Sequence, residues 1–300
     1  MTSLPGFSVV IPAYNYGHCL ARAVRSAAGQ DDPCFQVLVI DDGSTDDTAE
    51  VVTVLREEGW HFEYRYQPNA GVSAVRNRGV REAAYAWLIF LDADDELLAG
   101  ALRQFRNALE GDPGARLIIA GHESVLPDES VRPVRPPRMH GAGVGNLSLF
   151  LDKEVSIANG ACALHRDVFS AIEYRSDLRH TEDLPVFAHA LAHYPVTTTP
   201  EPVARIHKHG DSRRHDAQAA VALGMRLENI IFDESDLPPE AQSLRRDYRS
   251  RRALSLLKLC YRSGDYAHAV SYFMRAFRVR PLRALAPRYL RRFLVSLWKR

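Results

Sequence analysis

The stretch WLIFLDADD, residues 87–95, decides the fold class. Its five apolar residues run without a break and then give way to three carboxylates. A continuous apolar run of this length indicates a strand that is buried on both faces, as in a parallel sheet covered by helices. In open α/β sheets the ligand crevice lies at the carboxyl ends of the strands. The three acids therefore stand where such a sheet would bind a ligand.

Similar segments flank this strand on both sides. We predict further strands at residues 7–12, 37–40, 62–66 and 117–120. We predict helices between them at residues 19–28, 46–58, 72–84 and 97–109. Strands that alternate with helical crossovers imply an α/β fold with a mostly parallel, Rossmann-like sheet covered on both faces.

The remainder of the chain departs from this alternation. Residues 127–145 are rich in Pro, Gly and Arg and predict a long loop, whereas residues 156–165 predict an added strand. A helix is expected to start near Thr181, and almost everything after Asp216 has a helical pattern. One helical hairpin at 254–281 is similar to a single tetratricopeptide unit, which we expect to serve only in packing. We therefore predict a catalytic domain at 1–215 and a helical extension at 216–300.

The composition restricts the class of protein. The chain has 300 residues, 46% of them hydrophobic, and a net charge of +1, so a full core is expected and nucleic acid is not an expected partner. Its four cysteines form no CxxC pair, which favours reduced thiols in a cytoplasmic protein. No signal peptide and no apolar run of about 20 residues is visible, so we expect the protein to reach any lipid acceptor from the water side.

The acids at 92–95 have two interpretations. Three adjacent carboxylates repel one another unless a cation or hydrogen-bond donors neutralise them, and carboxylate oxygens suit Mg²⁺ or Mn²⁺. The alternative is a solvated turn that caps the next helix. A second acidic cluster, residues 41–46, follows the second strand. It either caps a helix or places a carboxylate against a nucleobase N–H or ribose hydroxyls.

Three further segments could carry chemistry. Residues 69–79 form a small-residue turn before a helix, whose N-terminus suits phosphate; Arg76 and Arg78 add cations, or are surface arginines. Glu182 and Asp183 follow Thr181, an N-cap candidate, and a carboxylate there could equally be a general base. His207 is either structural or part of a metal shell.

In this order, the segments resemble the large family of inverting nucleotide-sugar glycosyltransferases with the GT-A fold, often called glycosyltransferase family two. The resemblance runs from Phe7 to about Ser212 and rests on five motifs: SVVIPAYN (8–15), VIDDGS (39–44), residues 69–79, LDADD (91–95) and ED (182–183). The 127–145 loop has no counterpart in the family pattern.

The resemblance implies a role for each motif. Pro12, Ala13 and Tyr14, with Asp41 and Asp42, would hold the nucleotide. Arg76 would lie by the base and diphosphate, and Asp92 would contact the ribose. Asp94 would bind the metal, and His207 would bind the metal or the leaving diphosphate. Asp183 would be the catalytic base, with Glu182 beside it to help bind the acceptor.

The resemblance also implies an activity. The chain would transfer one sugar from a nucleotide-diphosphate donor, with UDP favoured, to a saccharide or lipid-linked acceptor, using Mg²⁺ or Mn²⁺. This transfer would take place in the assembly of a bacterial-type surface polysaccharide or glycolipid. A processive synthase would carry a QxxRW motif and membrane helices, and neither is visible.

Two other classes remain as alternatives. A sugar-phosphate nucleotidyltransferase would have a glycine-rich, basic loop after the first strand, where this chain has AYNYG at 13–17. A non-catalytic nucleotide-sugar-binding module would be expected to have lost Asp94 or Asp183.

The last part of the chain is basic. After Asp265 there are nine Lys and Arg residues and no acid. Residues 288–298 place apolar side chains on one helical stripe and cations elsewhere, as interfacial helices do. The pattern therefore predicts either peripheral contact with a membrane or a helix that packs on the core with a solvated basic face.

Overall fold

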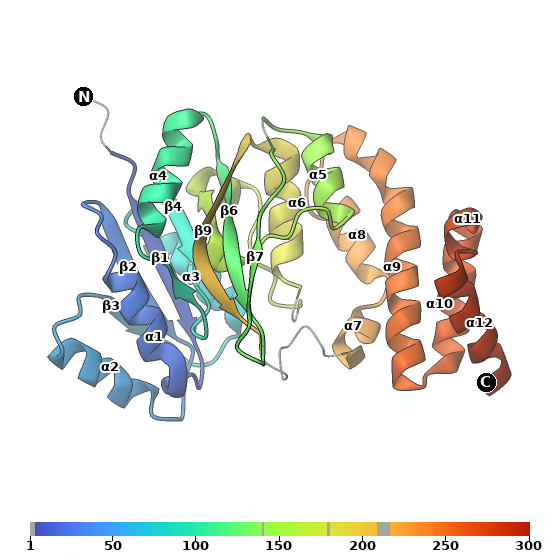
Figure 1. Ribbon diagram of the computed structural model, residues 1–300, viewed down its shortest axis with the longest axis horizontal. Helices are drawn as coiled ribbons and strands as arrows, with labels where there is room; N and C mark the ends of the chain where they lie inside the picture. The colour runs from blue at the N-terminus through green and yellow to red at the C-terminus, as the bar shows by residue number, and fades with distance from the viewer. Residues whose placement is uncertain (1–3, 140, 179–180, 209–216) are drawn as a thin grey trace.

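A nine-stranded sheet forms the centre of the molecule (Figure 1). The computed structural model describes residues 4–139, 141–178, 181–208 and 217–300. The strands are β1 (Phe7–Ala13), β2 (Phe35–Asp41), β3 (Glu63–Tyr66), β4 (Trp87–Phe90), β5 (Glu96–Leu97), β6 (Leu117–Val125), β7 (Val131–Val134), β8 (Cys162–His165) and β9 (Val196–His207). Their order is β3-β2-β1-β4-β8-β6-β9-β5, with β7 paired to β6.

The N-terminal half of the sheet is parallel. β1 pairs in parallel with both β2 and β4, and β2 does so with β3. β8 runs antiparallel between β4 and β6, while β9 is parallel to β6. The carboxyl ends of β1, β2 and β4 therefore meet at one edge, where the acidic motifs follow them. The predicted α/β, mostly parallel sheet is confirmed.

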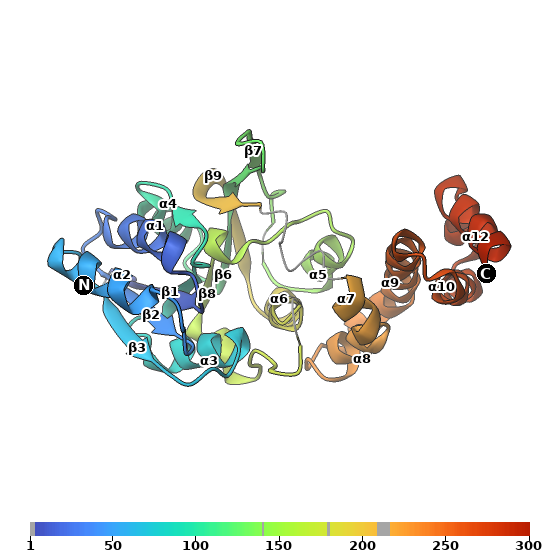
Figure 2. The same cartoon turned by 90° about the horizontal axis from the view of Figure 1, so that it is seen from below.

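Helices cover both faces of this sheet. The helices of this part are α1 (Gly17–Ala28), α2 (Thr48–Glu57), α3 (Val72–Glu82), α4 (Ala101–Gly111), α5 (Val144–Leu151) and α6 (Asp183–His193). Figure 2 shows α1, α2 and α4 on one face and α3 on the other. Successive β1 residues supply two separate cores, with Val9 and Ile11 facing α1, α2 and α4, and Val10 facing α3 and α6. This alternation is what a strand buried on both faces requires.

Three predicted segments differ in detail from the structure. The helix predicted at 97–109 begins only at Ala101, because β5 first pairs with β9 and Gly100 turns the chain with φ +77°. The loop predicted at 127–145 contains β7, which forms a hairpin with β6, and the start of α5. β7 is an exposed edge strand, so Pro133 can lie in it without breaking an inner ladder of hydrogen bonds. The strand predicted at 156–165 shortens to β8.

The C-terminal helices extend away from the sheet (Figure 2). They are α7 (Ala217–Leu223), α8 (Arg226–Asp233), α9 (Gln242–Ser263), α10 (Tyr266–Val279), α11 (Pro281–Ala284) and α12 (Pro287–Lys299). The predicted boundary at 215 lies outside the described residues. The apolar cores divide later: Ile231 and Tyr248 still pack into the sheet-side core, whereas residues from Ala253 onward build a separate helical core.

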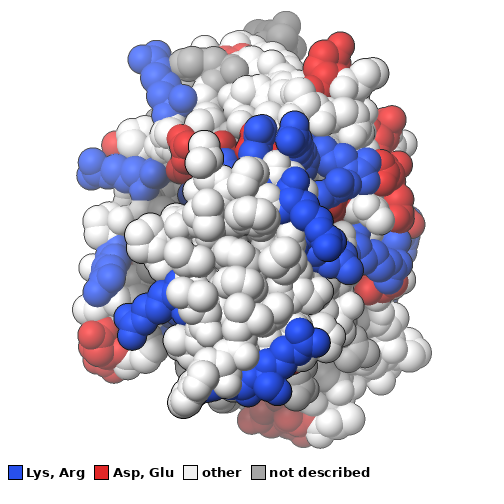
Figure 3. Space-filling model, turned by 90° about the vertical axis from the view of Figure 1, so that its right-hand side faces the viewer, with Lys and Arg blue, Asp and Glu red and all other residues white. Residues whose placement is uncertain are grey.

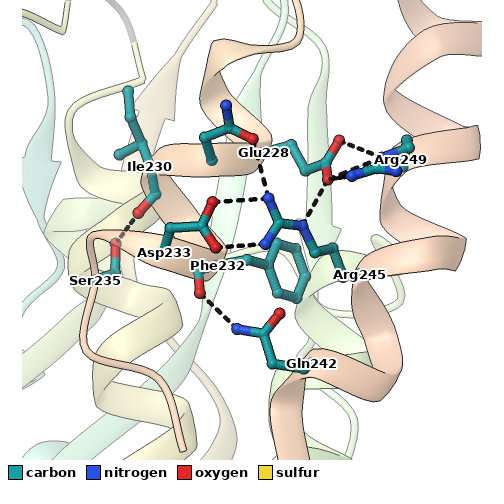
Figure 4. Close-up of polar contacts among 9 residues, drawn as sticks. Glu228, Ile230, Phe232, Asp233, Ser235, Gln242, Arg245 and Arg249 are labelled. Atoms are coloured by element: carbon teal, nitrogen blue, oxygen red, sulfur yellow. Dashed lines mark hydrogen bonds and ion pairs between the residues drawn. The ribbon is translucent and has the colours of Figure 1, made fainter. Parts of the chain in front are cut away.

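An ion-pair network joins α8 to α9 (Figure 4). The buried carboxylate of Glu228 accepts a hydrogen bond from Arg245 Nε at 2.8 Å and one from Arg249 Nη2 at 2.6 Å. Asp233 accepts from Arg245 Nη2 at 2.7 Å. Because Glu228 has two arginine partners, its desolvation is compensated and α9 is held against α8.

Candidate active site

The turns after β1 and β2 are locked together. Asp41 is buried and accepts hydrogen bonds from the Ser44 amide at 2.8 Å and the Tyr64 hydroxyl at 2.6 Å. Asn15 has φ +56°. Its backbone N–H donates to Ser44 Oγ at 2.9 Å, and its side-chain Oδ1 accepts from the backbone N–H of Thr45. These contacts fix the two loops against each other at the carboxyl edge of the sheet.

Asp42 holds the turn that precedes α3. Its Oδ1 accepts from Gln67 Nε2 at 2.7 Å and from the Ala70 amide at 2.9 Å, and its Oδ2 accepts from the Gly71 amide at 2.8 Å. Three of about four acceptor positions of this carboxylate are thus filled. Asp42 therefore sets the start of α3, and the Ala70 and Gly71 amides are satisfied by a side chain instead of a phosphate.

Arg76, on α3, joins two of the predicted motifs. It is 3% exposed, and its Nη1 donates to Glu182 Oε1 at 2.8 Å while its Nη2 donates to Asp92 Oδ1 at 3.0 Å. Its guanidinium also lies over the Tyr174 ring, 5.4 Å from the centroid. Burial alone would lower the pKa of Arg76, but the charges around it, Asp92 first among them, raise that pKa above its usual value. Arg76 is a fixed cation between the end of β4 and the start of α6.

Several buried polar atoms around Arg76 have no hydrogen-bond partner among the described residues. They are Arg76 Nε, Glu182 Oε2, Tyr174 Oη and Thr181 Oγ1. An unpaired buried polar atom costs about 1–3 kcal/mol, so such atoms gather only where another group or water completes them. This cluster of donors and acceptors points to a ligand site beside α6.

The acidic turn after β4 carries one deeply buried carboxylate. Asp95 is 5% exposed, and its Oδ1 accepts from the His207 amide at 2.8 Å. Burial, with the charges of Asp92 and Asp94, raises the pKa of Asp95 to about 8. Asp92 and Asp94 themselves are partly exposed. Crowded, poorly solvated carboxylates of this kind are stabilised when a divalent cation binds.

The remaining predicted residues lie around this turn. His207 Nε2 is 3.2 Å from Glu96 Oε1, and the backbone N–H of His207 donates to Asp95. These two contacts hold the end of β9 against the acidic turn. Asp183 begins α6 directly after Glu182, and its charge contributes to the raised pKa of Arg76. Ala13 is buried, while Tyr14 is 40% exposed at the end of β1. His180 and residues 209–212 lie outside the described residues.

The structure thus links several of the predicted site residues, either directly or through α3 and α6. Asp42 positions the start of α3, Arg76 on α3 binds Asp92 and Glu182, and Asp183 follows Glu182. Residues that had no individual role in the prediction include Asn15, Tyr174 and Asp95. Asp95 had the clearest signal, because it belongs to the acidic motif itself, whereas Tyr174 lies in a segment with no motif.

A second cluster of potential metal ligands lies elsewhere on α6. His189, His193 and Asp236 offer ligand atoms within 4.8 Å of one another, the one such group among the residues that the structure describes. His189 Nδ1 is 3.1 Å from the Ser235 carbonyl oxygen. The two histidines thus pack on the segment after α8, which carries Asp236, and none of the three is a predicted site residue.

A comparison with protein families decides the relationship. The model of the family described as Glycosyl transferase family 2 matches residues 8–172, more than half of the chain. The chain belongs to glycosyl transferase family 2. The chain is 37% identical over 97 residues to the uncharacterized glycosyltransferase YibD of Escherichia coli K12. The match covers 32% of this chain and 28% of YibD.

A second relative is named for an activity. The chain is 37% identical over 101 residues to the GalNAc(5)-diNAcBac-PP-undecaprenol beta-1,3-glucosyltransferase of Campylobacter jejuni, covering 33% of each chain. The matched segments therefore span a third or less of the length of these two relatives.

Solved structures share the whole fold. S. aureus TarS 1-349, in complex with UDP-GlcNAc, has a TM-score of 0.61 at 16% identity and covers 97% of this chain and 90% of that one. The mannosyltransferase PcManGT of Pyrobaculum calidifontis, in complex with GDP-Man and Mn²⁺, has a TM-score of 0.61 at 17% identity, covering 99% and 86%. The predicted GT-A fold with a helical C-terminal region is confirmed.

Proposed function

We propose that this protein transfers a single sugar from a nucleotide-diphosphate donor, with UDP favoured, to an acceptor hydroxyl with inversion at the anomeric carbon. The observation that carries the proposal is Arg76, which ties Asp92 on the donor side to Glu182 beside Asp183. A buried cation that bridges these two carboxylates holds the groups for donor binding and proton removal at one site.

The donor would lie along the carboxyl edge of the sheet. Pro12, Ala13 and Tyr14 would face the nucleobase, and Asp92 would contact the ribose. Asp41 and Asp42 already accept two and three hydrogen bonds from protein groups, so we assign them to shaping the two loops around the nucleotide. The exposed ring of Tyr14 offers a surface on which a base could stack.

The acidic turn fits a divalent cation. Its donors are carboxylate oxygens, which Mg²⁺ and Mn²⁺ prefer, and burial together with the charges of Asp92 and Asp94 raises the pKa of Asp95. Asp94 would hold the ion, with His207 nearby on β9. A bound ion would neutralise charge on the departing diphosphate. PcManGT, a structural neighbour, was solved with GDP-Man and Mn²⁺.

Asp183 is our candidate for the base. Its carboxylate would take the proton of the acceptor hydroxyl as that oxygen bonds to the anomeric carbon. The bond from this carbon to the diphosphate oxygen breaks, and the electron pair leaves with the nucleoside diphosphate. Arg76 holds Glu182 in place, so the chain next to the base is fixed by a buried ion pair.

We further propose a saccharide or lipid-linked saccharide as the acceptor, in surface polysaccharide or glycolipid assembly. Support comes from relatives: the C. jejuni relative is named for an undecaprenol-linked saccharide, and another is the chondroitin synthase of Pasteurella multocida, 30% identical over 128 residues.

The test is a donor screen. Thermal unfolding is measured with UDP-, GDP- and other nucleotide sugars, with Mn²⁺, Mg²⁺ or a chelator, and released nucleoside diphosphate is then assayed with candidate acceptors. We expect metal-dependent stabilisation by one donor class, lost in Asp94→Ala and kept in the exposed control Asp31→Asn. Pyrophosphate release from a nucleoside triphosphate and a sugar phosphate would instead establish a nucleotidyltransferase. Donor binding without transfer to any acceptor would favour a binding module.

A further inference from the structure

The far end of the helical extension exposes large apolar side chains. On α11, Leu282 is 87% exposed, and on α12 Trp298 is 84% and Leu294 54% exposed, with Leu285 and Leu297 also exposed. These five are half of the ten large exposed hydrophobic residues of the described chain, and we call them the apolar end face. Apolar side chains that gather on a surface in this way mark a binding face.

The inner side of α12 is already used for packing. Phe293 stacks on Phe273 of α10 with ring centroids 4.0 Å apart, and Ser296 is fully buried. At about 100° per residue, Leu294, Leu297 and Trp298 lie within an arc of about 100° next to this packed side. The helix is thus docked on α10, and the exposed arc is left over after docking.

The surroundings of this face are strongly basic. The nine Lys and Arg residues after Asp265 lie on α10, α11 and α12 or at their ends, without one acid among them. Arg280 and Arg283 pair with Asp247, and within the described part of the chain no ion pair engages the other seven. Figure 3, which looks at this end of the molecule, shows a broad uncharged area with Lys and Arg around it and most acids toward the margin.

We propose that the apolar end face binds an anionic lipid bilayer, with α12 lying in the plane of the interface. Leu294 and Trp298 would enter the boundary between headgroups and acyl chains, and Arg291 and Arg292 would contact anionic headgroups. An exposed Trp beside cations suits this boundary, because its ring is amphipathic. No helix of the described residues is long and apolar enough to cross a membrane, so this contact would be peripheral.

The charge distribution distinguishes a bilayer from a second copy of the chain. A two-fold dimer through this face would bring the same patch of each copy together, so the cations beside the patch on one copy would come close to those on the other. On an anionic surface, by contrast, each nearby Lys or Arg raises the binding affinity by about fivefold. The proposal concerns binding alone, so it stands or falls independently of the sugar that is transferred.

Vesicle sedimentation of the full chain tests the proposal. We expect binding to phosphatidylglycerol vesicles, little binding to phosphatidylcholine vesicles, and a decline as salt rises. Leu294→Ser with Trp298→Ser should weaken binding by about tenfold or more, and Arg291→Gln with Arg292→Gln by a similar factor. Val54→Ser, which alters an exposed apolar side chain on α2, should change nothing.

Fluorescence quenching tests whether Trp298 contacts the bilayer. Brominated phosphatidylglycerol should quench part of the wild-type emission, and Trp298→Phe should remove that quenching while binding persists. The proposal is overturned if wild-type protein stays in solution with anionic vesicles, or if both double variants bind as tightly as wild type. It is equally overturned if the wild-type protein does not bind vesicles and sedimentation equilibrium shows a dimer that Trp298→Ser dissociates.

Discussion

The carboxyl edge of the sheet and the helical end of the molecule use arginine in opposite ways. At the sheet edge one arginine, Arg76, is buried and donates to two carboxylates. At the helical end seven cations are left without an ion pair among the described residues. The first arrangement fixes the geometry of a site, because removing either partner leaves a buried charge uncompensated. The second contributes little to folding and is available to a partner.

The largest effect on stability is expected at Arg76. Arg76→Met would leave Glu182 buried without its cation, and we expect a loss of about 3–5 kcal/mol in the free energy of unfolding. Urea denaturation measures it. Arg78→Met is the matched control on the same helix; since Arg78 is partly exposed and pairs with Glu82 across one turn, its loss should be about 1 kcal/mol or less. Equal losses would mean that Arg76 is not a special link.

Asp42 should come next. Asp42→Asn replaces an acceptor-only carboxylate by a group that must turn an N–H toward one of its three donors. We expect a loss of about 2 kcal/mol and weaker donor binding, because the turn before α3 loosens. Calorimetric titration with the donor, beside urea denaturation, measures both. Asp47→Asn, an exposed residue with no side-chain cap bond, should leave both quantities unchanged.

The raised pKa of Asp95 leads us to expect that the stability of the metal-free protein depends on pH. Its pKa is about 8 in the folded protein, compared with 3.8 for an Asp in the unfolded chain. Between these two pH values the folded chain therefore holds a proton that the unfolded chain has lost. Stability must therefore fall as pH rises through this window, by about 1 kcal/mol from pH 6 to 7. Asp95→Asn, measured in chelator by urea denaturation, should flatten this slope. An unchanged slope would show that Asp95 does not titrate there.

The smallest effect is expected at the helical end. Arg291→Gln with Arg292→Gln should change the free energy of unfolding by no more than about 0.5 kcal/mol, because neither side chain belongs to a described ion pair. Chemical denaturation checks it. A loss as large as that of Arg76→Met would remove the contrast between the two regions and would make these arginines structural.

Much of the sheet could be predicted because its signal is local. The apolar runs before Asp41 and Asp92 indicated strands β2 and β4, whose acids lie at one edge of the sheet. Gly43 shows how local rules carry over: it has φ +81°, and an added Cβ would lie 2.8 Å from the Asn69 amide nitrogen, so the turn at the second motif needs glycine.

What could not be predicted depends on contacts distant in sequence. Asp95 is buried by β9, whose His207 is 112 residues further along the chain. Tyr174 lies under Arg76 from a segment without a motif, and β5 interrupts the predicted helix at 97–109 only because β9 is there to pair with it. Periodicity cannot register such partners. For the same reason the side chains that α12 buries against α10 were not distinguishable from those it exposes.

One measurement tests the single-site account most directly: donor affinity and turnover of Asp183→Asn, measured side by side. If the carboxylate removes the acceptor proton in a site already assembled by Arg76, the donor dissociation constant should stay within about twofold. Turnover should meanwhile fall by about 10²–10⁴. Turnover at the level of the unaltered protein would contradict the account, because no proton acceptor would then be required at the start of α6.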